Sequence, residues 1–277
     1  MKKQVCSFSG GRTSAYLCKL LLEKFGKDNV EFVFMDTGAE HPETYSFIKK
    51  CNKHFNLDLK CLRAKFDDKL GVGTTYTLVD INDINCDFIP FNQMMRKYGV
   101  PYIGGMFCTD RIKTTPFKKY CQDAFGADNY ETWLGIRVDE ERRLKSKEGI
   151  KYLADISDFD KQDVLDFWKE MPFDLEIPEW LGNCVFCPKK SNLKLAAAQR
   201  DEPKIYHEWL EYIYDNNVRF DSKTGHYSKM YRGKQSLESL IMSFDGLTGE
   251  SIKKRLRVTK TLDTNSCSES CEVFNLD

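Results

Sequence analysis

The sequence predicts an α/β fold, a doubly wound parallel sheet with helices on both faces, continued by a helical C-terminal extension. Through residues 3–63, short apolar runs alternate with segments of helical periodicity, which is typical of β–α–β units. Glycine-bearing turns directly follow two of these runs. The chain of 277 residues, 41% hydrophobic and 30% charged, is long enough to bury a large core. Because such units have right-handed crossovers, ligands are expected at the carboxyl ends of the strands.

The elements follow one another in a regular order. Strands are expected at residues 3–7, 30–35, about 57–63 and 131–136, and helices at residues 14–25, 42–54 and 160–171. Residues 67–105 are rich in glycine, threonine and asparagine around an amphipathic segment at 91–98, and we expect an insertion or lid there. Residues 193–216 are expected to be helical, with Pro203 opening a second piece, and a polar tail follows Lys260. The predicted division is an α/β domain at residues 1–190 and a helical extension at 191–277.

The charge and hydropathy of the chain argue against several classes of protein. Lysine plus arginine and aspartate plus glutamate both count 42, so no global positive field draws the protein to nucleic acid, and only a local basic patch could do so. No apolar run approaches the roughly 18 to 20 residues of a membrane-spanning helix, and Met1 opens no signal-peptide core. We therefore expect a cytoplasmic protein without a membrane partner.

The turn after the first strand joins a glycine pair and several hydroxyl groups to the start of a helix. Adjacent glycines let the backbone turn tightly and point its N–H groups at an anion, and the helix N-terminus adds the positive end of its dipole. The spacing is neither a Walker A motif nor a dinucleotide fingerprint, and an ordinary glycine turn is the alternative interpretation. The residues expected to cradle a phosphate or sulfate are Ser7, Ser9, Gly10, Gly11, Arg12, Thr13 and Ser14.

Charged residues follow later strands at the same edge. Asp36 ends the second strand, where a carboxylate can bind a ribose hydroxyl or a metal ion on the phosphates of a nucleotide. The alternative interpretation is that Asp36 only forms an ordinary turn. Lys113 offers a positive charge for a phosphate, and the guanidinium of Arg137 can bind a phosphate or sulfate through two parallel hydrogen bonds. Glu141 and Arg143 fit a solvated helix surface.

Eleven cysteines are many for a cytoplasmic protein, and an odd number does not suit a closed disulfide framework. Cys184 and Cys187 form a Cys-x-x-Cys pair, whose thiolates can bind one metal ion or one edge of an iron–sulfur cluster. The sequence has no second pair of this kind, which a structural zinc site would commonly need. A cluster, a zinc ion and free reactive thiols are the three interpretations. The cysteines expected to be small buried hydrophobes are Cys6, Cys18, Cys51, Cys61, Cys86 and Cys121.

Four motifs resemble those of known families. The Ser-Gly-Gly-x-x-Ser string from Ser9 resembles the PP-loop of the adenine nucleotide α-hydrolase superfamily. The Asp-Thr-Gly-x-x-x-Pro-Glu-Thr string from Asp36 resembles the second signature of the phosphoadenosine phosphosulfate (PAPS) reductase family. Cys-Thr-x-x-x-Lys-x-x-Pro from Cys108 and Gly-Ile-Arg-x-x-Glu from Gly135 resemble two further motifs of that family. The resemblance spans about residues 5–190 and implies a Rossmann-like nucleotide-binding domain, while the helical stretch after it looks like phage and mobile-element variants.

The resemblance implies roles for the residues of these motifs. The bound nucleotide would be ATP or PAPS, with Mg²⁺ needed if it is ATP. The residues that would border its ribose, adenine and phosphates outside the first turn are Asp36, Thr37, Gly38 and Gly135. The residues that would neutralise anionic oxygens as charge develops are Lys113, Arg137 and Arg142.

The resemblance also implies a [4Fe-4S] cluster. Its ligands would be Cys108, Cys184, Cys187 and one cysteine of the tail, either Cys267 or Cys271. We assign Cys267 to the cluster and Cys271 to the catalytic nucleophile.

Two chemistries fit the resemblance. In sulfonucleotide reduction, a cysteine thiolate attacks the sulfur of PAPS or adenosine phosphosulfate (APS), and a thioredoxin-like thiol donor resolves the S-sulfocysteine. In ATP pyrophosphatase-type sulfur transfer, cleavage of the α–β bond of ATP activates an acceptor, which could be nucleic acid, and a cysteine desulfurase could supply the sulfur. The alternative is an inactive nucleotide sensor or accessory subunit.

Two departures from the reductases argue against reduction. The iron–sulfur reductases have an adjacent cysteine pair where this chain has Phe107 and Cys108. Their terminal Glu-Cys-Gly-Leu-His is matched here only at Cys271.

Overall fold

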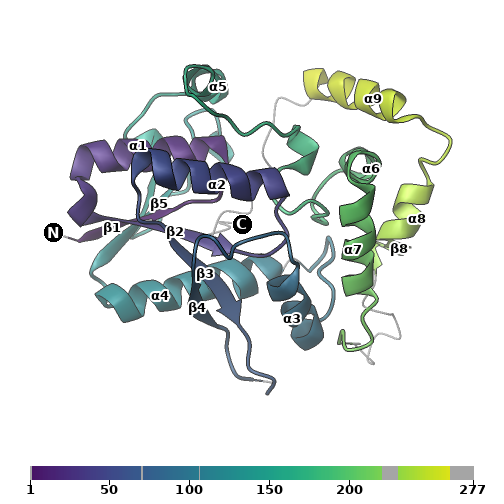
Figure 1. The fold of residues 1–277 in the computed structure, drawn as a ribbon, viewed down its shortest axis with the longest axis horizontal. Helices are drawn as coiled ribbons and strands as arrows, with labels where there is room; N and C mark the ends of the chain where they lie inside the picture. The colour runs from purple at the N-terminus through teal and green to yellow at the C-terminus, as the bar shows by residue number, and fades with distance from the viewer. Residues whose placement is uncertain (1, 70, 106, 220–229, 263–277) are drawn as a thin grey trace.

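The computed structural model describes residues 2–69, 71–105, 107–219 and 230–262, with the backbone alone for 259–262. It confirms a Rossmann-like α/β fold, whose six-stranded sheet has the order β4-β3-β2-β1-β5-β6 (Figure 1). β4 runs antiparallel to β3, and the other neighbours are parallel. The strands are β1 Lys3–Ser7, β2 Val30–Asp36, β3 Lys60–Lys65, β4 Thr75–Val79, β5 Tyr130–Leu134 and β6 Ile150–Tyr152.

Helices cover both faces of the sheet because successive strand residues point to opposite sides. Cys6 of β1 belongs to the core beneath α1, α2 and α5, whereas its neighbour Val5 belongs to the core against α4. Within the described ranges, every helix is too short or too polar to span a membrane. The helices of this part are α1 Arg12–Phe25, α2 Pro42–Phe55, α3 Ile89–Tyr98, α4 Thr115–Phe125 and α5 Lys161–Lys169.

The expected strands and helices of the first 63 residues are present, with ends that differ by a few residues. The interpretation of residues 67–105 as an insertion or lid is wrong in part, because Thr75–Val79 forms β4 at the edge of the sheet. The alternation of threonine with larger side chains in this segment is typical of a strand and could have predicted it. β6 has only three residues and was not predicted, since so short a strand carries no recognisable period.

The C-terminal part packs beside α3 and includes a small β-ribbon that the sequence did not suggest. Pro203 begins the second helical piece, as predicted. The Trp209 ring lies 5.2 Å from that of Phe88 and 4.9 Å from that of Phe91, so this part shares an apolar core with the segment around α3. Its elements are α6 Asn192–Asp201, α7 Pro203–Ile213, β7 Met230–Arg232, β8 Gln235–Ser236, α8 Leu237–Met242 and α9 Gly249–Leu262.

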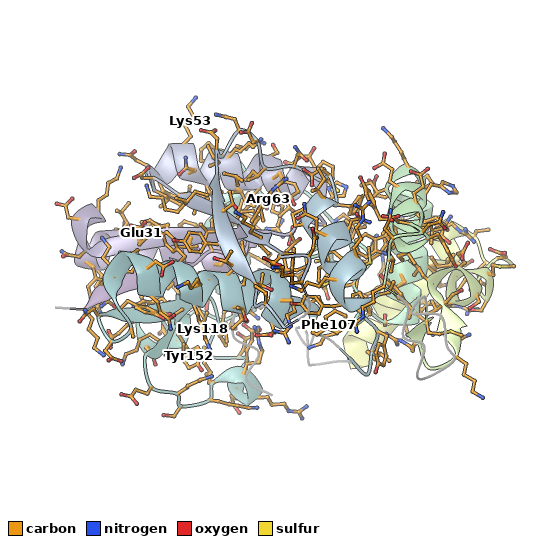
Figure 2. All side chains as sticks on the ribbon, turned by 90° about the horizontal axis from the view of Figure 1, so that it is seen from below. Glu31, Lys53, Arg63, Phe107, Lys118 and Tyr152 are labelled. Carbon is orange, nitrogen blue, oxygen red and sulfur yellow. The ribbon has the colours of Figure 1, made fainter. Side chains whose placement is uncertain are left out.

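The parallel strands end on the side of the sheet that faces the C-terminal helices. In Figure 2, Glu31 near the beginning of β2 lies away from those helices, whereas Arg63 near the end of β3 lies towards them. Buried Ser7 ends β1, and Asp36 ends β2 at the same side. We call this side the carboxyl edge.

Candidate active site at the carboxyl edge

The turn between β1 and α1 is held by serine hydroxyl groups. Gly10 has a φ of +83°, and a Cβ there would lie 2.9 Å from Ile48 Cδ1, so glycine is required. Ser14 Oγ accepts from the Ser9 N–H at 3.2 Å and donates to the Gly11 carbonyl at 3.0 Å. α1 follows without an acidic residue in its first turn, which leaves the positive end of its dipole uncompensated within the helix. Such a turn can receive an anion.

Two of the arginines expected at a phosphate have other surroundings, since the Arg12 side chain is bound elsewhere and Arg142 is exposed. Arg12 binds the two carboxylate oxygens of Asp174 at 2.6 and 3.0 Å and donates to the Leu175 carbonyl. Its side chain therefore fastens α1 to the segment after α5, and only its backbone belongs to the turn. Arg142 is exposed within the short helical turn Glu141–Arg143.

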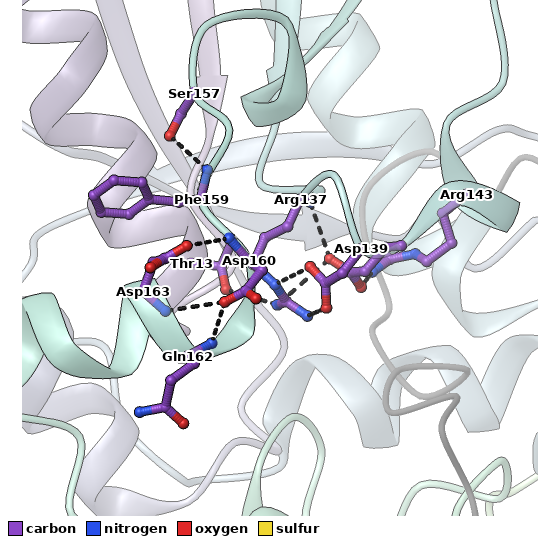
Figure 3. A network of polar contacts seen from close by, with 10 residues as sticks. Thr13, Arg137, Asp139, Arg143, Ser157, Phe159, Asp160, Gln162 and Asp163 are labelled. Carbon is purple, nitrogen blue, oxygen red and sulfur yellow. Dashed lines mark hydrogen bonds and ion pairs between the residues drawn. The ribbon is translucent and has the colours of Figure 1, made fainter.

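Arg137 and Gly135 lie beside the turn, as Figure 3 shows for Arg137 and Thr13. A Cβ on Gly135 would come within 2.9 Å of Ser14 Cα, so the close approach of this segment to α1 requires glycine. The Arg137 guanidinium donates to Thr13 Oγ1 at 3.1 Å and to the two oxygens of Asp139 at 2.8 and 3.0 Å. The structure thus brings together four of the residues expected at a phosphate, from segments more than a hundred positions apart.

The Asp36 carboxylate is satisfied within the protein. It accepts from the Gly38 N–H and the Tyr45 hydroxyl, both at 2.9 Å, and from Arg63 Nε at 2.7 Å. Burial raises the pKa of Asp36 to about 6, against the opposing effect of the Arg63 charge. Arg63 also pairs with Asp87 at 2.8 Å, next to the tight turn at Gly38. Sequence reasoning missed Arg63, because a lone arginine at the end of a strand carries no motif.

Glu40 connects the second turn with Lys113. Its Oε2 accepts from Thr37 Oγ1 at 2.5 Å and from the Tyr45 hydroxyl at 3.0 Å, and its Oε1 lies 3.4 Å from Lys113 Nζ. Both charged groups are buried. Lys113 stands in a π-helical turn, Thr109–Thr114, a geometry frequent at functional sites. Glu40 was not singled out from the sequence, although it stands inside the second signature.

Three distant cysteines line one hollow. Cys108 precedes the π-helical turn, and Cys184 and Cys187 come from the loop before α6. They line this hollow together with Thr37 and Lys113. We call it the cysteine hollow, and we call residues 184–190 the cysteine loop.

The cysteine loop is attached to the turn after β2. The Val185 N–H donates to the Ala39 carbonyl at 3.0 Å, and Cys184 forms an isolated antiparallel bridge with Glu40. Cys184 Sγ lies 3.9 Å from Thr37 Oγ1. The cysteine hollow therefore adjoins the segment whose sequence resembles a nucleotide signature.

Buried and half-buried side chains hold the cysteine loop through its backbone carbonyls. Lys190 Nζ donates to the Val185 carbonyl at 3.0 Å. Arg232 Nη2 donates to two carbonyls of the loop at 2.8 and 2.6 Å, and the Tyr231 hydroxyl donates to a third. Burial, reinforced by the three nearby cysteines, raises the pKa of Tyr231. Tyr231 and Arg232 lie in β7, so no local sequence signal could have connected them with this loop.

The donor set of the cysteine hollow suits a soft metal, because thiolates bind zinc and iron–sulfur clusters. Among the described residues, no three histidine, cysteine, aspartate or glutamate side chains converge closely enough to hold a metal ion. Cys267, predicted as the fourth ligand, and Cys271, predicted as the nucleophile, lie outside the described residues.

The remaining described cysteines are buried or half-buried, as expected for packing residues. Cys6 Sγ and Cys18 Sγ are 3.5 Å apart as free thiols between β1 and α1. Burial raises the pKa of Cys86 to about 12, so this thiol stays neutral near pH 7.

A mostly parallel sheet with helices on both faces, a glycine-bearing turn before α1 and three cysteines at one edge define a Rossmann-like α/β protein with a candidate anion site. Comparisons with known proteins identify the family. The family model for the phosphoadenosine phosphosulfate reductase domain matches residues 3–77. The chain is 47% identical over 275 residues to the uncharacterized nin region protein ORF290 of Escherichia phage lambda, covering 98% of this chain and 94% of that protein. This chain belongs to the PAPS reductase-like family, in its phage-type variant.

The alignments with more distant relatives cover a smaller share of those proteins. The chain is 25% identical over 178 residues to a phosphoadenosine 5′-phosphosulfate reductase of Buchnera aphidicola, covering 62% of this chain and 63% of the reductase. It is 22% identical over 221 residues to an uncharacterized protein of Methanocaldococcus jannaschii, covering 75% of this chain and 41% of that protein.

Proposed function

We propose that this protein is an adenine-nucleotide-dependent enzyme of sulfur chemistry. The phosphate or sulfate of the nucleotide would lie in the turn at residues 9–14, with its ribose and adenine beside residues 36–38. The observation that carries the proposal is the attachment of the cysteine loop to the turn after β2, through the hydrogen bond from Val185 to Ala39 and the bridge between Cys184 and Glu40. A nucleotide at the carboxyl edge and a reacting sulfur would therefore be neighbours.

The cations of the site have separate tasks in this proposal. Arg137, bonded to Thr13, would hold an oxyanion at the first turn. Lys113, which lines the cysteine hollow and is placed by Glu40, would neutralise charge that develops on the group passing between nucleotide and sulfur. Exposed Arg142 would act only at the outer end of the nucleotide.

Two reactions use this arrangement. The match to the reductase family supports the first, whereas the departures at Phe107 and around Cys271 count against it, so both reactions are proposed and tested in parallel. In reduction, the thiolate of Cys271 attacks the sulfur of PAPS, an S–S bond forms, the S–O bond to the phosphate breaks, and adenosine 3′,5′-bisphosphate leaves. A thioredoxin-like thiol then attacks the S-sulfocysteine and releases sulfite. In sulfur transfer, an acceptor oxygen attacks the α-phosphate of Mg-ATP and pyrophosphate leaves. The terminal sulfur of a cysteine persulfide, supplied by a desulfurase, then displaces AMP from the acceptor. A second cysteine thiol attacks the carrier sulfur of the resulting disulfide, which releases the thiolated acceptor and leaves a cysteine disulfide.

The three described cysteines do not converge on a single metal ion, but they line one hollow, and on that placement we also propose that it holds a [4Fe-4S] cluster, with Cys108, Cys184, Cys187 and Cys267, which lies outside the described residues, as its ligands. A bound cluster would supply electron or sulfur chemistry beside the nucleotide. Lys190, Tyr231 and Arg232 would keep the loop that carries two of the ligands in place. Iron, sulfide and zinc content with an absorption spectrum on anaerobically purified protein tests this, and about four iron and four sulfide per chain are expected.

Parallel anaerobic assays with PAPS and with Mg-ATP test the enzyme proposal itself. Release of sulfite or of pyrophosphate assigns the substrate. Cys184→Ala is expected to lower turnover to background, whereas Cys121→Ala, which alters a buried cysteine of α4 that packs against the sheet away from the hollow, should retain it. Tight nucleotide binding without product in either assay would contradict the enzyme proposal and indicate a sensor or accessory subunit.

A further inference from the structure

We propose that Asp139 is an internal substitute for the bound oxyanion. Its carboxylate occupies Nε and Nη2 of Arg137 at 2.8 and 3.0 Å, and the phosphate or sulfate of a nucleotide must displace it (Figure 3). The inference rests on the proposed function, because it concerns the nucleotide bound at the same carboxyl edge.

The geometry of the pair fits this role. A guanidinium presents two parallel N–H groups that match a carboxylate and a tetrahedral oxyanion equally well. Asp139 uses that pair of donors. A phosphate or sulfate that binds Arg137 in the same two-pronged manner would therefore take the place of the Asp139 oxygens.

The two partners differ in their freedom to move. The Arg137 side chain is 6% exposed, whereas that of Asp139 is 34% exposed. The arginine is also fixed by its bond to Thr13 Oγ1 at 3.1 Å. Asp139 can thus turn into solvent while Arg137 stays in place.

The neighbouring carboxylate, that of Glu140, is held too firmly for a ligand to displace it. Glu140 is 7% exposed and lies 3.5 Å from Arg137 Nη1. It also accepts the backbone N–H of Arg137 at 3.1 Å and pairs with Arg143. Three attachments hold Glu140 in the fold, and of these two carboxylates it is Asp139 that combines a two-pronged contact with exposure.

The position of the pair connects it with the first turn. Thr13 belongs to the first turn of α1, which contains no acidic residue. Asp139 therefore brings a carboxylate, through Arg137, next to the positive end of this helix. An arriving oxyanion would find Arg137 already neutralised beside the open helix end, so that only a charged ligand able to replace the carboxylate would gain from the arginine.

The test is the affinity of three ligands, ATP, PAPS and adenosine, measured by titration calorimetry on the full chain. Asp139→Asn keeps the size of the side chain and removes its charge, and we expect about tenfold tighter binding of the anionic nucleotide, equivalent to about 1.4 kcal/mol. Adenosine, which carries no oxyanion, should bind the variant and the wild type equally. The nucleotide with the larger gain, ATP or PAPS, is the one that places its oxyanion on Arg137.

Two further variants separate displacement from a general change of charge. Glu141→Gln removes the same charge from an exposed position of the same segment and should leave both affinities unchanged. Arg137→Lys in the Asp139→Asn background should abolish the gain, because an ammonium group does not offer the two parallel donors.

The outcomes distinguish this inference from the proposed function. Wild type that binds a nucleotide, with Asp139→Asn binding it no tighter, overturns the inference alone. An equal gain in Glu141→Gln also overturns it. Failure of both wild type and Asp139→Asn to bind any of the three ligands overturns the proposed function and this inference together.

Discussion

The carboxyl edge and the cysteine hollow touch each other, yet they are held together by different kinds of contact. At the edge, cations pair with side-chain carboxylates, as in Arg12 with Asp174, Arg63 with Asp36, Lys113 with Glu40 and Arg137 with Asp139. At the hollow, buried or half-buried donors bind backbone carbonyls of the cysteine loop. The half-exposed carboxylates of Asp139 and Asp174 can rotate away from their arginines, whereas Asp36 and Glu40 are buried and a loop carbonyl cannot leave without refolding the loop. The comparison indicates that the exposed pairs of the edge can exchange partners beside a hollow that keeps its shape.

The largest effect is expected at the hollow. Lys190→Met leaves buried carbonyls without their charged donor and should lower the free energy of unfolding by about 3 kcal/mol. It should also speed the alkylation of Cys184 and Cys187 by iodoacetamide while the nucleotide affinity of the folded protein stays the same. Urea unfolding and mass spectrometry measure the two quantities. Lys234→Met, at an exposed lysine, is the control, and a Lys190 variant as stable as this control would contradict the rigid hollow.

The next effect is expected at the carboxyl edge. Gly135→Ala would push a Cβ to 2.9 Å from Ser14 Cα, so it should lower the stability by about 2 kcal/mol and open the contact between Arg137 and Thr13. Nucleotide affinity should fall by more than about tenfold, while the alkylation rates of the cysteines remain unchanged. Gly73→Ala, where a Cβ would meet nothing within 4 Å, should change neither quantity. Equal behaviour of the two variants would show that the approach of Gly135 to α1 is unimportant.

Asp36 lies where the two regions meet, and its raised pKa leads us to expect that the free energy of unfolding depends on pH. Because the pKa of this carboxyl is raised in the folded protein from 3.8 to about 6, the native state holds the proton more tightly than the unfolded chain. Its stabilising contribution is complete below about pH 4 and is lost as the pH rises through 6, by about 3 kcal/mol. Asp36→Asn lacks this change. Urea unfolding of both proteins between pH 4 and 7 measures it, and a difference between them that stays constant with pH would contradict the assignment.

The smallest effect is expected at Arg12. Asp174→Asn weakens a half-exposed pair and should change the free energy of unfolding by less than about 1 kcal/mol. Since the Arg12 side chain points away from the first turn, nucleotide affinity should not change. A marked change in calorimetric affinity would show that Arg12 reaches the ligand after all, and that the edge exchanges this partner too.

Much of the fold could be predicted because its signals are local. The apolar runs, the glycine turns and Pro203 each act within a few residues, and the structure has elements at all of these places. The juxtaposition of Arg137 with Thr13 followed from topology, since both come after parallel strands and meet at one edge.

The side chains that hold the site residues in place could not be predicted, because each of them is distant in sequence from the residue that it contacts. Arg63 reaches Asp36 only through the register of β3 beside β2. Tyr231 and Arg232 contact the cysteine loop from a β-ribbon whose strands are too short to show an alternation of apolar and polar residues. Asp139 stood within a motif, but its pairing with Arg137 depends on side-chain geometry that the sequence does not encode locally.

The central claim is that the carboxyl edge and the cysteine hollow form one reaction centre. The most direct measurement is the rate of iodoacetamide alkylation of Cys184 in metal-free protein with and without saturating nucleotide, followed by mass spectrometry, with added N-acetylcysteine as the internal reference. The account predicts that bound nucleotide slows alkylation of Cys184 several-fold and leaves the rate of the added thiol unchanged. An unchanged rate at Cys184 in protein shown by calorimetry to be saturated with nucleotide would contradict it.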